Sequence, residues 1–297
     1  MVGVHGDTRV VKRGEAFADR VLGDRTLARL ATRLSQASLR VLAYHDIEQV
    51  EPFRAQMEYV ATHYAPVSGQ DVVAWLDGKP LPPKAVWVTF DDGYPSVVSE
   101  GMAVLAAFGI PATMFVCPGV VDSNQPYWWH VVEAVEPAAV PRLKTVPDAQ
   151  RREEVARLGE LISDSTGAPP ARPQLTTPQM QSWIDAGFEV GSHTWDHPML
   201  DRCSEHEQDR QIRLAHEWLL DRIEPILFAH PNGNWTTHAE ALLAELGYRV
   251  YARFDHKLAG PNPSMSRLRV NATEDIDRFR AIVSGVHPLV HRLRGGS

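Results

Sequence analysis

The sequence predicts an α/β protein organised as one parallel, barrel-like domain. Strand-like apolar runs alternate with helix-like segments along most of the chain, which is typical of βαβ units and a parallel sheet. The 297 residues suffice for one large barrel or two ordinary domains. Because no internal repeat or low-complexity linker divides the chain, we expect a single barrel.

An N-terminal helical extension is expected before the barrel. Residues 14–37 place apolar side chains mainly three or four positions apart, which predicts one or two amphipathic helices laid over the body. A membrane-surface role is the alternative, but acidic and basic residues are mixed in this segment. We therefore assign 1–38 to the extension and 39–297 to the barrel and its terminal helix.

The elements of the barrel region follow from apolar periodicity and from the residues that end each run. Strands are expected at 39–46, 65–68, 85–90, 110–116, 188–192, 226–229, 249–253 and 267–270. Helices are expected at 52–63, 69–78, 97–108, 148–165, 179–186, 204–223, 236–247 and 274–291. Gly109 closes one of these helices and Thr177-Pro178 opens another. A loop is expected at 117–129.

Composition excludes several classes of protein. The formal net charge of −7 and the lack of a dense Lys/Arg block argue against nucleic-acid binding. Two isolated cysteines, Cys117 and Cys203, imply no disulfide framework. The start of the sequence lacks the apolar region of a secretory signal, and no stretch is long and apolar enough to span a bilayer. We expect a cytoplasmic protein, with a processed mature form as the open alternative and the oligomeric state undetermined.

Two adjacent acids end the most strand-like run of the sequence. The segment 85–90 is apolar, β-branched and aromatic, and it leads directly into Asp91, Asp92 and Gly93. Neighbouring carboxylates repel each other, and a bound cation favours the ionised form of both. The alternative is an ordinary Asp-Gly turn. Carboxyl ends of parallel strands are where α/β proteins place their chemistry, so we expect a site here.

Two histidines follow another expected strand. His193 and His197 are four residues apart, a spacing that puts two imidazoles on one face of a helical turn. A similar pair at His287 and His291 lies in a basic terminal segment and is interpreted as surface. In a parallel barrel the two strand ends converge, so one aspartate and both histidines of the first pair would make a three-ligand divalent site. A bound water there falls in pKa from 15.7 to about 7 and becomes a nucleophile, and the second aspartate is free to act as base.

Together these segments resemble the polysaccharide deacetylases of the NodB-homology type, carbohydrate esterase family 4. The segment 89–93 (TFDDG) is similar to the first motif of that family, and 192–197 (SHTWDH) to the second. The resemblance extends over roughly 39–285 and implies a distorted (β/α) barrel, here of about seven strands, with metal-dependent deacetylase activity on a saccharide. It also implies the site roles: Asp91 as catalytic base, and Asp92, His193 and His197 as metal ligands. Zinc is the expected ion, with cobalt, manganese or iron as alternatives.

The sequence departs from the family pattern at two places. Ala229 occupies the position of the arginine in the third motif, whose remaining residues here are Pro231, Asn232 and Gly233, with the oxyanion amide at Asn232. We expect Arg267 to replace that arginine and to lie within hydrogen-bonding distance of Asp91. The usual histidine motif for the general acid is absent, which leaves three candidates: His45, His230 and His256.

The remaining expectations concern the substrate. Trp128 and Trp129, with Tyr127, fall in the expected loop 117–129, where they can stack on a sugar; burial in the core is the alternative. The expected substrate is an N-acylated amino sugar. Two alternatives stay open, a metal-dependent amidohydrolase acting on a non-sugar amide or imide and a non-catalytic saccharide-binding member of the family.

Overall fold

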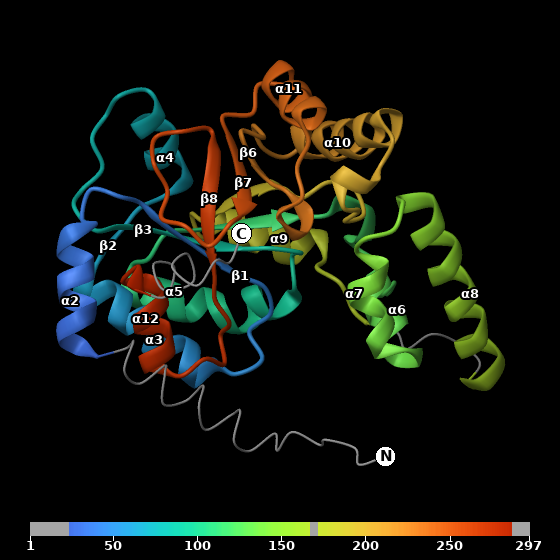
Figure 1. Cartoon of the computed structure of the whole chain (residues 1–297), viewed down its shortest axis with the longest axis horizontal. Coiled ribbons are helices and arrows are strands. Elements are labelled where there is room, and N and C mark those ends of the chain that lie inside the picture. Colours follow the sequence, from blue (N-terminus) through green and yellow to red (C-terminus); the bar gives the residue numbers. More distant parts are fainter. Residues whose placement is uncertain (1–23, 167–171, 287–297) are drawn as a thin grey trace, which may run out of the picture.

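A closed parallel barrel forms the centre of the molecule. The computed structural model describes residues 24–166 and 172–286, and it shows seven parallel strands closed into a barrel surrounded by helices, with a further short strand on one of them (Figure 1). In chain order the strands are β1 Arg40–Tyr44, β2 Ala65–Pro66, β3 Ala85–Phe90, β4 Ala112–Val116, β5 Glu189–Ser192, β6 Leu227–Ala229, β7 Val250–Phe254 and β8 Ser264–Arg269. The predicted distorted (β/α) barrel of about seven strands is confirmed.

The barrel closes between its first and last strands. Strand β1 pairs with β3 on one side, from Arg40 opposite Val86 to Tyr44 opposite Phe90, and with β8 on the other. The remaining strands continue in the spatial order β8, β7, β6, β5, β4 and β3, and β2 pairs only with the first two residues of β3. Only β1 therefore separates β8, which comes late in the sequence, from the acidic strand β3.

Alternation along β3 separates the two sides of the barrel wall. Val86, Val88 and Phe90 belong to the apolar layer under the surrounding helices. Trp87 belongs instead to a cluster of residues from strands around the whole barrel, which places it in the interior. By the same alternation Asp91 continues the interior face, so the strand delivers this acid to the carboxyl end of the barrel.

Helices surround this barrel and supply the outer half of the core. Those near the barrel are α2 Arg25–Leu34, α3 Val50–His63, α4 Gly69–Leu76, α5 Met102–Phe108, α9 Thr177–Asp185, α10 Glu205–Leu220, α11 Thr237–Glu245 and α12 Ile276–Val283. The π-helical turn η1 Val97–Gly101 precedes α5, where the sequence predicted regular helix; Gly101 allows the side chain of Ile47 to approach its backbone closely. None of the helices in residues 24–166 and 172–286 is long and apolar enough to cross a bilayer.

A helical lobe stands beside the barrel, between β4 and β5 in the chain (Figure 1). It contains α6 Trp128–Val135, η3 Pro137–Ala139, α7 Val140–Leu143 and α8 Asp148–Thr166, packed around a small apolar core of their own. Only α8 was expected. The predicted loop 117–129 is partly wrong, since it contains the short helix η2 Pro118–Val120 and the first two residues of α6.

Some expectations lie outside the described residues. The N-terminal part of the predicted extension, residues 1–23, is not described, and neither is 287–297, which includes the second histidine pair. The domain boundary at residue 38 therefore stays a prediction.

Candidate metal centre and active site

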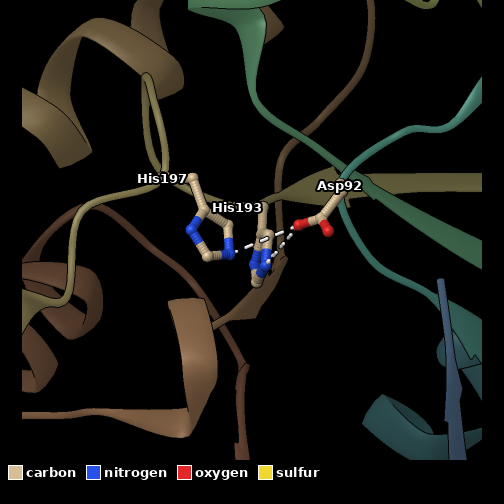
Figure 2. A group of neighbouring side chains, drawn as sticks. All are labelled: Asp92, His193 and His197. Carbon is tan, nitrogen blue, oxygen red and sulfur yellow. Dashed lines mark ion pairs between the residues drawn. The ribbon is translucent and has the colours of Figure 1, made fainter. Parts of the chain in front are cut away.

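Three potential metal ligands meet at the carboxyl end of the barrel. Asp92 follows β3, and His193 and His197 lie in the loop after β5. One ligand atom from each lies within 4.8 Å of the others. Asp92 Oδ1 is 3.5 Å from His193 Nε2 and 3.3 Å from His197 Nε2, and all three side chains point toward one another (Figure 2). The three side chains expected from the two strand ends are thus brought together.

The loop, not a helical turn, brings the two histidines together. Thr194 and His197 adopt left-handed backbone conformations, with φ of 68° and 63°, which no helix contains. Three hydrogen bonds hold this shape. Thr194 Oγ1 accepts one from the His197 N–H, and the buried Gln211 side chain accepts the other two from the N–H groups of Trp195 and Asp196. The helical explanation of the spacing is wrong, although the convergence that it predicted is present.

The ring of His193 is oriented for metal binding. Its Nδ1 lies 2.7 Å from the carbonyl oxygen of Ala229, which can only accept, so Nδ1 is the donor and Nε2 is the ring nitrogen left to face Asp92. This carbonyl belongs to the segment that lacks the family's arginine.

The environment of Asp92 fits a divalent cation. Its Oδ1 is buried and accepts no hydrogen bond from the described residues, and His197 Nδ1 likewise has no partner among them. Burial favours the neutral carboxyl, but His197 and His193 outweigh it and lower the pKa of Asp92. Burial lowers the pKa of His197 to about 3, which keeps that imidazole neutral at physiological pH. One buried carboxylate and two imidazoles are a donor set that suits zinc.

Asp91 is held by an arginine from the other end of the chain. Arg267 Nη1 donates to Asp91 Oδ1 at 2.7 Å and Nη2 donates to Oδ2 at 2.9 Å, and both side chains are buried. Burial opposes ionisation of Asp91, but the charge of Arg267 outweighs it and lowers the pKa of Asp91. The guanidinium also lies over the ring of Phe254, 4.4 Å from its centroid. The predicted hydrogen-bonding distance between Arg267 and Asp91 is confirmed, while the catalytic roles of both stay predictions.

A cavity of about 830 Å³ opens onto Asp92 and His197. His45 and Asn232 line it, as does His256, whereas His230 does not. Partial burial lowers the pKa of His45, which stacks on Phe254. Asn232 has a left-handed φ of 54° in the turn η5 Pro231–Gly233. Its neighbours Pro231 and Gly233 shape this turn and are not among the lining residues.

The aromatic residues Tyr127, Trp128 and Trp129 lie at the start of α6, and two of them contact the candidate metal ligands. The ring of Trp129 stacks on Tyr127, with centroids 4.4 Å apart, and meets His197 edge-on at 4.7 Å. The Tyr127 hydroxyl donates to the backbone carbonyl of Asp92. Trp128 also borders the cavity, but its side chain is 93% buried in the core of the helical lobe. Trp129 is therefore the residue of this pair that lies against the candidate metal ligands.

His130 and Arg152 lie near the site and were not identified from the sequence. His130 lines the cavity and accepts at Nε2 from the Trp129 indole N–H at 3.0 Å; its place beside the aromatic run was the only signal. Arg152 of α8 reaches across to Asp196 with two hydrogen bonds, of 3.1 and 2.9 Å, and so ties the helical lobe to the histidine loop. No sequence pattern indicated that contact.

Comparison with solved structures finds proteins with a similar fold. IcaB from Ammonifex degensii is similar in structure, with a TM-score of 0.61 and 21% identity over 84% of this chain and 97% of that one. The Streptococcus pyogenes deacetylase PplD, solved with acetate, has a TM-score of 0.59 and 19% identity over 81% and 96%. A de-N-acetylase from Aggregatibacter actinomycetemcomitans has a TM-score of 0.61 and 16% identity over 82% and 99%. At these identities the likeness establishes the fold.

The sequence itself also matches a family model. The model described as "Polysaccharide deacetylase" matches residues 78–251, more than half of the chain. That segment contains the acidic strand end and the histidine loop. The chain therefore belongs to the polysaccharide deacetylase family.

Proposed function

We propose that this protein is a metal-dependent deacetylase that removes an N-acetyl or related acyl group from an amino sugar. Family membership supports saccharide deacetylation. The observation that supports metal dependence and a separate catalytic base is that two adjacent acids have different surroundings. Asp92 faces two imidazoles, while Asp91 is held apart by the two hydrogen bonds from Arg267.

Asp92, His193 and His197 would hold the metal. A divalent ion bound there supplies a Lewis acid and lowers the pKa of bound water toward neutrality. Zinc suits the donor set best, and cobalt, manganese and iron accept the same ligands. The hydrogen bond from His193 Nδ1 to Ala229 fixes the ring whose Nε2 faces Asp92.

Asp91 is the proposed general base. Its lowered pKa keeps it ionised at neutral pH, so it is ready to accept the proton of the attacking water. Arg267 fixes the plane of this carboxylate, and Oδ2 lies 3.9 Å from His193 Nε2, at the edge of the ligand set. From this position Asp91 would accept a proton beside the proposed metal ligands.

The cavity supplies the remaining roles. His45 is the proposed donor of a proton to the leaving amine, because it lines the cavity wall and its lowered pKa makes its protonated form a stronger acid. The backbone amide of Asn232 is the proposed donor to the oxyanion. Trp129 is the proposed stacking surface for a sugar ring.

Acyl release and metal content, measured together, test the proposal. Zinc- or cobalt-loaded protein should release acetate from N-acetylated amino sugars. Asp92→Asn should lose both stoichiometric metal and activity, whereas Asp91→Asn should keep the metal and lose about 10²–10⁴-fold in kcat. Failure of the loaded wild-type protein to retain metal would refute the assignment. Acyl release from non-sugar amides alone would favour the amidohydrolase alternative, and saccharide binding without any release would favour a binding protein.

The cytoplasmic location expected from the sequence remains part of this proposal. Fractionation of cells that produce the protein, followed by immunodetection, tests it directly.

A further inference from the structure

Two cations face the cavity without an acidic partner. Lys144 follows helix α7, and Arg269 ends strand β8; both line the cavity that opens onto Asp92. Among residues 24–166 and 172–286, neither side chain forms an ion pair with an acid. Both side chains therefore lie at the wall of the same cavity as the proposed metal centre with no acid paired to them.

The other two cations of the cavity are compensated. Arg172 Nη2 lies 3.7 Å from Asp46 Oδ2, and Lys257 Nζ lies 3.4 Å from Asp255 Oδ2. Each of these four residues lines the cavity as well. The contrast singles out Lys144 and Arg269 as the pair that has charge available for a ligand.

A hydrogen bond fixes the ammonium of Lys144 in a position where burial disfavours its charge. Its ammonium donates to Asn232 Oδ1 at 3.0 Å, which fixes it beside the turn after β6. Burial lowers the pKa of Lys144, and the charge of Arg269 lowers it further. The side chain of Lys144 is half-buried and that of Arg269 is exposed, and a bound oxyanion would offset both the cost of burying the ammonium and its repulsion from the guanidinium.

Acidic residues in the cavity offset only part of that cost, because the pKa of Lys144 remains lowered. Asp92, Glu48 and Glu133 also line it, and the charges of Asp92 and then Glu133 favour protonated Lys144. In the described part of the chain, however, Glu133 makes no ion pair with Lys144.

We propose that Lys144 and Arg269 form a subsite for an oxyanion carried by the substrate, so that the amino sugar bears a phosphate or carboxylate group. A guanidinium fork and a compact ammonium are the two side chains that bind such groups through charge-assisted hydrogen bonds. Because the cavity is shared with Asp92 and His197, one molecule can occupy both the subsite and the metal centre. This inference rests on the proposed deacetylase function and specifies its substrate class.

Matched substrates test the subsite. Zinc-loaded protein is assayed with N-acetylglucosamine, with its 1-phosphate and with the corresponding N-acetylated uronic acid. We expect kcat/KM to be at least about tenfold higher for one of the anionic sugars, the size of one hydrogen bond to a charged group. Phosphate and carboxylate are distinguished by which of the two anionic sugars shows the preference.

Three variants test which residues produce the preference for an anionic sugar. Lys144→Met and Arg269→Met should each remove about tenfold of kcat/KM for the preferred anionic sugar, mainly through KM, and leave the neutral sugar nearly unchanged. Lys257→Met is the matched control, because this lysine lines the same cavity but is already paired with Asp255. It should retain the preference.

A binding experiment separates the subsite from the chemistry. Titration calorimetry with glucosamine 1-phosphate and glucosaminuronic acid, the deacetylated products, measures the subsite without turnover. Loss of binding in the Lys144→Met/Arg269→Met double variant, but not in Lys257→Met, supports the subsite even if no acyl release is found. Equal turnover of neutral and anionic sugars, with equal binding in all variants, overturns the inference and leaves the deacetylase proposal standing.

Discussion

Replacing Arg267 by lysine should slow catalysis without removing the metal. The arginine makes two hydrogen bonds to Asp91, of 2.7 and 2.9 Å, and a lysine ammonium can keep at most one of them. A lost hydrogen bond to a charged group costs about 1.5–3 kcal/mol. At about 1.36 kcal/mol per factor of ten, kcat should fall about 10- to 150-fold if Asp91 is the base and its orientation governs proton transfer.

The assay compares kcat, metal content and stability in matched variants. Arg40→Lys is the control: Arg40 is also fully buried, but it donates to the carbonyl oxygens of Val283, Ser35 and Ser38, away from the site. That variant should lose unfolding stability and keep its kcat once folded. The reasoning is refuted if Arg267→Lys retains full kcat, or if it loses metal in proportion to activity.

Three further predictions follow from the contacts around the cavity. Trp129→Ala should raise KM with little effect on stability, whereas Trp128→Ala should lower the unfolding free energy by about 3–5 kcal/mol, as measured by urea denaturation, because its side chain is buried. Burial, reinforced by the charge of Arg172, lowers the pKa of His130 to about 4. As pH falls from about 6.5 to about 4 the unfolded chain therefore binds a proton that the folded chain does not, and stability should drop; His130→Gln should lose less stability between pH 7 and pH 5 in the same measurement. Arg152→Met should weaken zinc retention about tenfold in a chelator competition, because Asp196 in the histidine loop loses both hydrogen bonds; unchanged retention would show that the loop holds its shape unaided.

The convergence of the candidate metal ligands could be predicted because strand ends in a parallel barrel have a fixed place. A buried run that stops at Asp91 and Asp92, and a second strand followed by His193, must deliver their side chains to the same end. The position of Arg267 followed from barrel closure, which brings the last strand beside the first and hence near β3. These inferences needed only strand order and direction.

Contacts made by loops and by the helical lobe could not be predicted in the same way. The spacing of His193 and His197 suggested a helical turn, but left-handed residues produce the same convergence. The start of α6 at Trp128 has no side-chain cap, so the sequence there resembles a loop. The link from Arg152 to Asp196 depends on how the lobe docks, which no local pattern encodes.

Closure of the barrel by β1 and β8 limits how the protein can be shortened. A recombinant fragment cut at residues 78 and 251, the bounds of the family match, would contain Asp92 and both histidines. It would lack β1, with His45 at its end, and β8, with Arg267. Strand β3 would lose its pairing to β1, and most of β7 would be missing, which leaves two open strand edges able to pair with other chains. Such a fragment should aggregate, and any soluble fraction would retain the ligand set while lacking the arginine that holds Asp91.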